Sequence, residues 1–302
     1  RWIEQGSLPQ FSLAQMAEQY RSGGVTVALG LPSIAYTEGS CAGGGSEVNS
    51  GLYWRPPLDV VERWRREFGI HDLDPDEIDR IADEVETALD VSLLPGPASA
   101  QSRVLERGAR RLGWKEGEIP RWMRYPEQVV GSPGAEGERR TMTRTYLPRA
   151  IGAGARLAVG CRVDRLERLG SRSGIAHVVR DGSRSCAVRF KAAVVCAGAI
   201  HTPALLQRSG LRHNIGRTLA VHPTVKLTAR FAEPLNLVDD VPVHQVKEFA
   251  PSLSFGGSAS HPGLLALTLL DHWSAFRHAM DDWDRLSVYY AAITSEGTGA
   301  VR

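Results

Sequence analysis

A run of glycines followed by small polar side chains lies near the start of the chain. Its members, called here the glycine loop, are Gly43, Gly44, Gly45, Ser46 and Asn49. Glycines let a backbone approach a ligand closely, and successive N–H groups in such a loop can face anionic or polar oxygens. Ser46 and Asn49 would add side-chain donors. A flexible surface loop is the alternative, but the flank is aromatic (Tyr53 and Trp54) rather than serine-rich. The pattern therefore favours a ligand-binding loop.

A carboxylate follows a short apolar stretch at the first residues, where Glu4 precedes Gly6. In a dinucleotide-binding fold, an acid at the end of the second strand accepts hydrogen bonds from ribose hydroxyls. The glycine turn that binds the phosphates lies about 20 residues earlier in such folds, which here falls before residue 1. An acid that is only solvated is the alternative interpretation of Glu4.

A second glycine-centred segment lies at residues 192–210. The unbroken apolar run 192–197 predicts a parallel strand buried on both faces, and the strand is expected to stop at Gly198. Thr202 and Pro203 are typical of an N-cap and first helical position, and Gly210 of a helix end. This order, strand, glycine and helix, is half of a parallel crossover.

The elements around these segments follow from apolar spacing. Residues 74–89 predict an amphipathic helix, with a solvated acidic face and Asp74 and Pro75 at its start; a second helix is expected to end at Gly113. Alternation from residue 157 and the Asp181–Gly182 turn predict an antiparallel meander over 155–190. Further strand-like runs lie at 225–231, 264–270 and 288–293.

The sequence lacks the motifs of several other classes of chemistry. There is no GxSxG motif, so a serine hydrolase is not indicated. His272 and His278 are six residues apart, on different helix faces, and no metal site is expected. The four cysteines form no CxxC pair. An arginine group is interpreted as a solvated face rather than a nucleic-acid patch: Arg139, Arg140, Arg144 and Arg149.

The length and composition of the chain limit the number of domains and the kinds of partner that can be expected. The chain has 302 residues, enough for two domains, with 42% apolar and 23% charged residues and a net charge of +2. This balance gives no reason to expect a nucleic-acid partner. No apolar stretch reaches the roughly 18 residues of a membrane span. We expect a cytoplasmic protein.

Taken together, these segments resemble the glucose–methanol–choline (GMC) family of flavoprotein oxidoreductases. The longest likeness is at residues 197–211 (AGAIHTPALLQRSGL), which is similar to the second signature of the family. Residues 43–55 resemble its GGxSxxN…R segment, 3–6 its LExG strand end, and 214–223 its following GxNLxxHP stretch. Residues 143–150 are similar to the branch that contains long-chain alcohol oxidases and related bacterial dehydrogenases. The likeness spans most of residues 1–230.

The resemblance implies an α+β fold in which an α/β, Rossmann-like FAD-binding domain is interleaved with a mixed-sheet substrate domain. We assign residues 1–57 and 145–222 to the FAD domain, 58–144 to a helical substrate-domain segment, and 223–302 to the substrate domain. The implied cofactor is FAD. The family's contacts fall on matched positions: Glu4, Gly6, Gly43, Gly44, Gly45, Ser46, Asn49, Val163, Ala197, Gly198 and Ala199. We predict that these residues, Gly6 apart, surround one cavity.

The implied activity is oxidation of an alcohol, with the hydride passing to flavin N5 while a histidine takes the hydroxyl proton. The small-molecule substrate would be a hydrophobic or long-chain alcohol, and the resemblance does not identify the electron acceptor. No stretch matches the family's C-terminal catalytic pair, and His222 matches a different family position. Residues 126–140 also depart from the branch, which often has cysteines there. We expect a fragment of a longer protein that is inactive alone; a flavin-binding module without chemistry and a lyase with redox-silent FAD remain alternatives.

Overall fold

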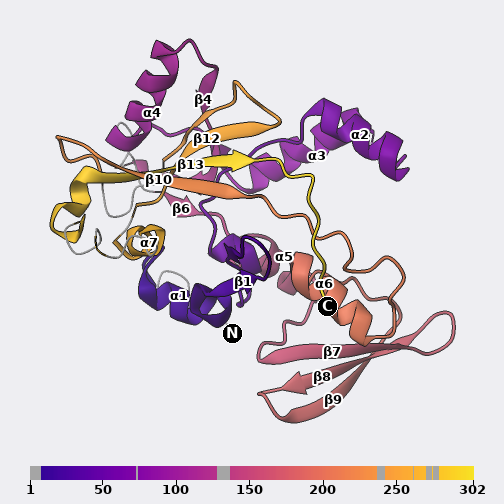
Figure 1. The fold of residues 1–302 in the computed structure, drawn as a ribbon. Helices are drawn as coiled ribbons and strands as arrows, with labels where there is room; N and C mark the ends of the chain where they lie inside the picture. The colour runs from indigo at the N-terminus through magenta and orange to yellow at the C-terminus, as the bar shows by residue number, and fades with distance from the viewer. Residues whose placement is uncertain are drawn as a thin grey trace. The chain divides into compact units, whose positions relative to one another are not determined.

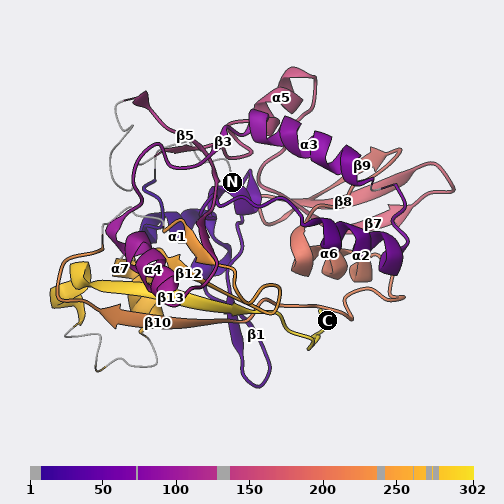
Figure 2. The same ribbon diagram turned by 90° about the horizontal axis from the view of Figure 1, so that it is seen from above.

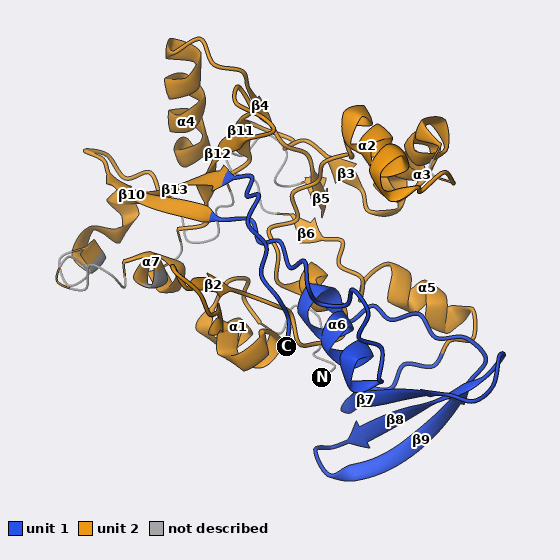
Figure 3. Cartoon of the chain, turned by 45° about the vertical axis from the view of Figure 1, so that its right-hand side comes forward, with its two compact units in different colours: residues 1, 156–223, 293–302 blue, residues 2–155, 224–292 orange. Residues whose placement is uncertain are grey.

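The structure is a computed structural model that describes residues 8–72, 74–127, 137–236, 242–260, 262–269, 274 and 279–302. Helices and strands are mixed along the chain, and the fold class is α+β, as the sequence predicts (Figure 1). Two compact units are distinguished in Figure 3. The meander unit comprises residues 156–223 and 293–302, and the main unit comprises the described residues of 2–155 and 224–292. Which unit carries a cofactor domain or a substrate domain stays a prediction.

The largest sheet of the main unit has five strands in the order β10-β13-β12-β11-β4. The sequence-distant pairs β10 with β13 and β11 with β4 are antiparallel. The strands are β10 (Thr224–Arg230), β13 (Leu286–Ile293), β12 (Leu253–Ser258), β11 (His244–Val246) and β4 (Glu116–Glu118). Strands are therefore present in the predicted runs 225–231 and 288–293.

Two helices pack against this sheet, and Figure 2 shows α4 lying across it. Helix α4 (Ala100–Arg111) carries the fully buried Gln101, whose Nε2 donates to the carbonyl oxygens of Ser258 and Val288 at 3.1 and 3.0 Å. Helix α7 (Pro262–Thr268) contributes Leu265 to a core with Leu286 and Val288. The sheet is thereby fixed to α4 by polar contacts and to α7 by apolar ones.

The prediction of a strand at 264–270 is wrong, because residues up to Thr268 belong to α7. Periodicity alone does not separate a short buried helix from a buried strand. Pro262 opens the helix at a position where the missing N–H costs nothing, and this signal favours the helix.

The main unit also contains further helices, 3₁₀ turns and two smaller sheets. The helices are α1 (Leu13–Gln19), α2 (Leu58–Phe68), α3 (Pro75–Ala88) and α5 (Tyr146–Gly152), with 3₁₀ turns η1 (Arg21–Gly24), η2 (Gly44–Glu47) and η5 (Met280–Arg285). Strand β1 (Thr26–Ala28) pairs with β2 (Ile34–Tyr36), and β3 (Val91–Ser92), β5 (Arg121–Arg124) and β6 (Glu138–Arg139) form a third sheet. The predicted helices at 74–89 and before Gly113 are confirmed as α3 and α4.

The acidic face of α3 is only partly a solvated surface. Asp79 and Asp83 are exposed, but Asp83 and the half-buried Glu86 both accept hydrogen bonds from Arg55, each at 2.5 Å. Arg55 therefore connects α3 to the chain segment that follows the glycine loop.

The meander unit contains the antiparallel sheet that the alternation predicts. It consists of β7 (Cys161–Arg168), β8 (Gly174–Arg180) and β9 (Arg184–Phe190). Asp181 and Gly182 have φ of +49° and +79°, as the central residues of a type I′ turn require, and the Ser183 N–H donates to the Arg180 carbonyl at 3.2 Å. Because Arg180 pairs with Arg184, three residues connect the two strands. The strand begins at Cys161, later than the alternation from residue 157 indicates.

Two expectations about residues 192–210 are wrong. Residues 192–197 form no strand, and Val194 is 89% exposed. A buried parallel strand exists only where neighbours bond both its edges, and none of the described strands pairs with this segment. Helix α6 (Gly198–Arg208) also starts four residues before Thr202, so Pro203 lies inside it. The predicted helix end is confirmed, since Gly210 follows with φ +88°.

Candidate functional site

The glycine loop begins with two residues in the left-handed region. Gly43 has φ +86° and Gly44 has φ +57°, and the chain then enters η2. A Cβ on Gly43 would collide with the carboxylate of Glu47, whereas a Cβ on Gly44 or Gly45 would meet nothing within 4 Å. Gly43 is therefore required by the fold of the loop itself, and the backbone of Gly44 and Gly45 borders open space.

Ser46 and Glu47 attach the loop to a distant part of the main unit. The Ser46 hydroxyl donates to the Gly43 carbonyl at 2.8 Å and accepts the N–H of Met142 at 3.1 Å. The Glu47 carboxylate accepts from the Thr143 hydroxyl at 2.8 Å. The Ser46 side chain, expected from the sequence to serve a ligand, thus supports the loop in this structure.

Helix α1 and the residue after it hold the other side of the loop. Gln15 is 4% exposed, and its Nε2 donates to the Glu47 carbonyl at 3.0 Å. The Tyr20 hydroxyl donates to the Val48 carbonyl at 3.0 Å. Asn49 is exposed, and its Oδ1 accepts the N–H of Gly51 at 3.0 Å. The loop is therefore fixed on both sides, while Gly45 and Asn49 remain exposed.

A buried guanidinium lies beneath the loop. Arg139 is 4% exposed, lies 5.8 Å from the centre of the Phe11 ring, and directs an Nη atom to within 3.5 Å of the Ser46 carbonyl oxygen. Burial, and secondarily the charge of Arg121, lower the pKa of Arg139 to about 10, while Tyr20 and Glu47 act in the opposite direction. Burial in turn raises the pKa of Tyr20. The loop therefore lies against a cationic group that water hardly screens.

The interpretation of the arginine group as a solvated face is wrong for Arg139. Its strand β6 pairs Arg139 with Met123 of β5, and this pairing turns the side chain inward. Arg140 and Arg144 are half-buried, and the exposed Arg149 lies over the Tyr146 ring at 5.2 Å. No local sequence signal distinguishes Arg139 from its neighbours, because its burial follows from a strand pairing between segments with Gly and Pro between them.

The predicted residues of the meander unit lie at the start of α6 and on β7. Gly198 has φ +83°, and a Cβ there would meet nothing within 4 Å. Ala197 and Ala199 are exposed, and the Ala197 N–H donates to the Thr202 hydroxyl oxygen at 3.1 Å. Val163 is 36% exposed and pairs with Val178 of β8. This segment, like the glycine loop, presents glycine backbone to open space.

The predicted set divides into three parts. Glu4 and Gly6 lie outside the described residues. The glycine loop belongs to the main unit, and Val163 and residues 197–199 belong to the meander unit. The single cavity expected from the sequence therefore stays a prediction, and so does the distance between Glu4 and Gly198. His272 and His278 also lie outside the described residues.

Known proteins place the chain in a family. Residues 16–224 match the family described as GMC oxidoreductase. The chain belongs to the GMC oxidoreductase family. This agrees with the resemblance drawn from residues 43–55 and 197–211.

Curated relatives of this GMC oxidoreductase differ in how far they are characterised. An uncharacterized GMC-type oxidoreductase of Sinorhizobium fredii is 38% identical over 99% of the chain and 61% of its own length. Another uncharacterized member, from Mycobacterium tuberculosis, is 31% identical over the whole chain and 49% of its own length. A long-chain-alcohol oxidase of Arabidopsis thaliana is 28% identical over 71% of the chain and 31% of its own length. The chain thus spans about three fifths of the first relative and about half of the second.

The described residues fit the flavin cofactor that the family implies. A bound cofactor needs backbone that it can approach closely, and Gly44, Gly45 and Gly198 all border open space. An anionic cofactor also gains from a buried cation nearby, and Arg139 supplies one beneath the loop.

Among the described residues, no helix is long and apolar enough to cross a membrane.

Proposed function

We propose that the protein of which this chain forms part is an FAD-dependent oxidoreductase that oxidises the CH–OH group of a hydrophobic or long-chain alcohol. The observation that carries the proposal is the glycine loop, whose open face at Gly44 and Gly45 is fixed by contacts on its other sides. Membership of the GMC oxidoreductase family and the likeness to a long-chain-alcohol oxidase support the choice of reaction.

The residues of this chain would bind and orient the cofactor. When bound, FAD supplies the hydride acceptor at N5. Gly44 and Gly45 would let it approach the main-chain N–H groups of the loop, and Asn49 would add a side-chain amide. Glu47 and Thr143 keep the loop in place through their hydrogen bond. Because Arg139 is buried, its charge would act on the cofactor with little screening by water.

Substitution of Gly45 tests whether the cofactor lies against the loop. Gly45 does not have positive φ, and a Cβ there meets nothing within 4 Å, so Gly45→Ala should fold as well as the wild type. If FAD packs on this backbone, Gly45→Ala should weaken FAD binding by about tenfold or more, which corresponds to about 1.4 kcal/mol. Flavin fluorescence quenching measures the affinity. Gly108→Ala, in the middle of α4 and also in open space, is the matched control.

The reaction is tested on the FAD-loaded, full-length protein under anaerobic conditions. Addition of a long-chain primary alcohol should bleach the visible absorbance of the flavin, and a short polar alcohol should bleach it more slowly. Binding of FAD without bleaching by any alcohol would contradict the proposed oxidation and favour a binding module or a lyase. Unchanged FAD affinity in Gly45→Ala would contradict the placement of the cofactor while leaving the reaction open.

A further inference from the structure

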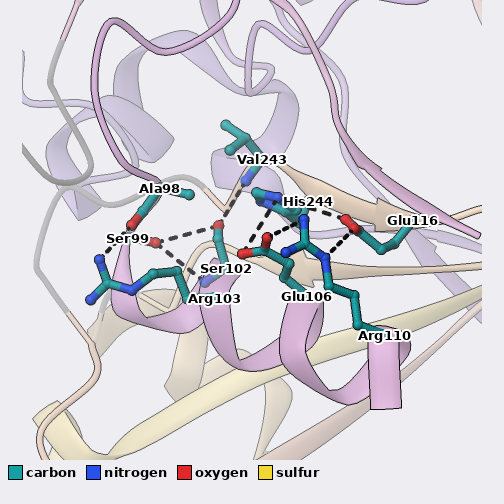
Figure 4. Close-up of polar contacts among 9 residues, drawn as sticks. All are labelled: Ala98, Ser99, Ser102, Arg103, Glu106, Arg110, Glu116, Val243 and His244. Atoms are coloured by element: carbon teal, nitrogen blue, oxygen red, sulfur yellow. Dashed lines mark hydrogen bonds and ion pairs between the residues drawn. The ribbon is translucent and has the colours of Figure 1, made fainter. Parts of the chain in front are cut away.

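Three side chains with metal-binding atoms converge in the main unit, away from the glycine loop. Glu106 lies on α4, Glu116 on β4 and His244 on β11, and Figure 4 shows them together. In the antiparallel pairing of β4 with β11, Glu116 opposes Val246, and His244 opposes Glu118. Glu116 and His244 are therefore diagonal neighbours on one face of the sheet, and α4 packs against both strands.

The spacing of the three side chains is too wide for hydrogen bonds. The Nε2 of His244 lies 3.9 Å from Glu106 Oε2 and 3.8 Å from Glu116 Oε2, and the three ligand atoms all lie within 4.8 Å of one another. A tetrahedral site with bonds of about 2.0–2.2 Å places its donors about 3.3–3.6 Å apart. A contraction of a few tenths of an ångström would therefore bring each carboxylate–His244 pair to the separation found in a metal centre, and the two carboxylate oxygens, which lie within 4.8 Å of each other, would have to approach by at most about 1.5 Å.

Arg110 fixes the orientation of both carboxylates. Its Nη2 lies 2.6 Å from Glu106 Oε1, and its Nε lies 3.0 Å from Glu116 Oε1 (Figure 4). Each carboxylate therefore uses one oxygen for Arg110 and turns the other toward His244. Hydrogen bonds of this kind orient carboxylate ligands in metal sites.

The burial of the His244 imidazole is a second observation, separate from the spacing of the three side chains. The residue is 8% exposed, and its Nδ1 has no hydrogen-bond partner among the described residues. The other ring nitrogen, Nε2, faces the two carboxylates at 3.9 and 3.8 Å, beyond hydrogen-bond distance, so the buried imidazole directs a nitrogen into the cluster without a hydrogen bond to either carboxylate. With a neutral imidazole, the two carboxylates and Arg110 leave one net negative charge in the cluster, which favours a cation.

We propose that Glu106, Glu116 and His244 bind a divalent transition-metal cation of the zinc type. One imidazole nitrogen and two carboxylate oxygens are a donor set that such cations accept, and water would complete a four-coordinate shell. The Arg110 side chain is 67% exposed, so a cation can reach the cluster from that side. Because the ligands come from α4, β4 and β11, the bound cation would cross-link the helix to the end of the sheet.

Zinc titration of the metal-free protein tests the proposal. Calorimetry on the purified chain, after dialysis against a chelator, should show one Zn²⁺ per chain. His244→Gln and Glu116→Gln should each weaken binding by about tenfold or more. The matched control is His177→Gln, which removes a half-buried histidine of the meander unit, whose Nε2 lies 2.8 Å from Glu167 Oε2. This control should bind Zn²⁺ as the wild type does.

The chain also has free thiols, three of them exposed at Cys161, Cys186 and Cys196, and these could bind zinc instead. The Co²⁺ adduct of the wild type separates the two, because thiolate ligands add an intense near-ultraviolet band and nitrogen and oxygen ligands do not. Absence of that band and loss of affinity in either variant would support the site. Unchanged affinity in both folded variants, a thiolate band, or no stoichiometric binding by the wild type would overturn it. If one variant fails to fold by circular dichroism, the other and the Co²⁺ spectrum decide.

Discussion

Gly43 and Gly198 have nearly the same backbone conformation, with φ of +86° and +83°, but very different surroundings. Gly43 faces the Glu47 carboxylate closely, within a loop fixed by contacts to α1 and to residues 142 and 143. Gly198 borders open space, and residues 192–197 before it form no helix or strand and are mostly exposed. Two glycines from two different family segments, 43–55 and 197–211, are therefore held in different ways: Gly43 by packing and Gly198 by the start of a helix.

Replacement of each glycine with alanine should cause the greatest loss of stability. Gly43→Ala adds left-handed strain of about 1–2 kcal/mol and displaces Glu47 from Thr143, for a total loss of about 2–4 kcal/mol. Gly198→Ala adds the strain alone, about 1–2 kcal/mol. Urea unfolding followed by circular dichroism measures both. Equal losses would show that the packing around Gly43 contributes nothing to stability.

The buried charge beneath the loop gives a second, smaller effect. Arg139→Met keeps most of the volume and removes a cation whose burial lowers its pKa to about 10, so it should change stability at neutral pH by only about 1 kcal/mol.

The difference in stability between the wild type and Arg139→Met should change with pH in a definite direction. Because the folded pKa of Arg139 lies below the unfolded value, the unfolded chain binds more protons above about pH 10. The destabilising charge is present below that pH and is relieved above it. Wild-type stability should therefore rise relative to Arg139→Met by on the order of 1 kcal/mol per unit above about pH 10. Burial raises the pKa of Tyr20 and acts oppositely in both proteins; the Arg139 charge partly offsets this shift in the wild type only, so the pKa of Tyr20 should lie higher in Arg139→Met. A difference that is constant with pH would show that Arg139 is not electrostatically strained.

The smallest loss of stability is expected from removing one of two hydroxyl groups, that of Ser46 in the glycine loop or that of Thr202 in α6. Ser46→Ala removes the contacts to the Gly43 carbonyl and the Met142 N–H and should cost about 1 kcal/mol. Thr202→Ala removes one exposed contact, from the Ala197 N–H, and should cost no more than about 0.5 kcal/mol. Denaturant midpoints at equal slope measure the difference. A larger loss in Thr202→Ala would mean that the start of α6, rather than the glycine loop, depends on its side-chain contact.

The sequence predicts best where the signal is local. Asp74 and Pro75 mark the start of α3, and Asp181–Gly182 marks the hairpin between β8 and β9, because each depends only on its own backbone angles. The run 192–197 fails as a strand because strand formation depends on partners elsewhere in the chain. For the candidate site, the three consecutive glycines indicate the loop. The hydrogen bond between Thr143 and Glu47 connects residues 96 positions apart and has no local sequence signal. The burial of Arg139 and of His244 has no local sequence signal for the same reason.

That 96-residue separation has a consequence for the order of folding. The glycine loop takes its final shape only when it contacts residues 141–143. Helices α2, α3 and α4 lie in the long chain segment between the two ends of this contact. Contacts of such long range form late, after local helices. Closure entropy grows slowly with length, at about 0.6 kcal/mol per doubling. The intervening segment can therefore lengthen or shorten between relatives at little energetic cost, provided that both ends of the contact are kept.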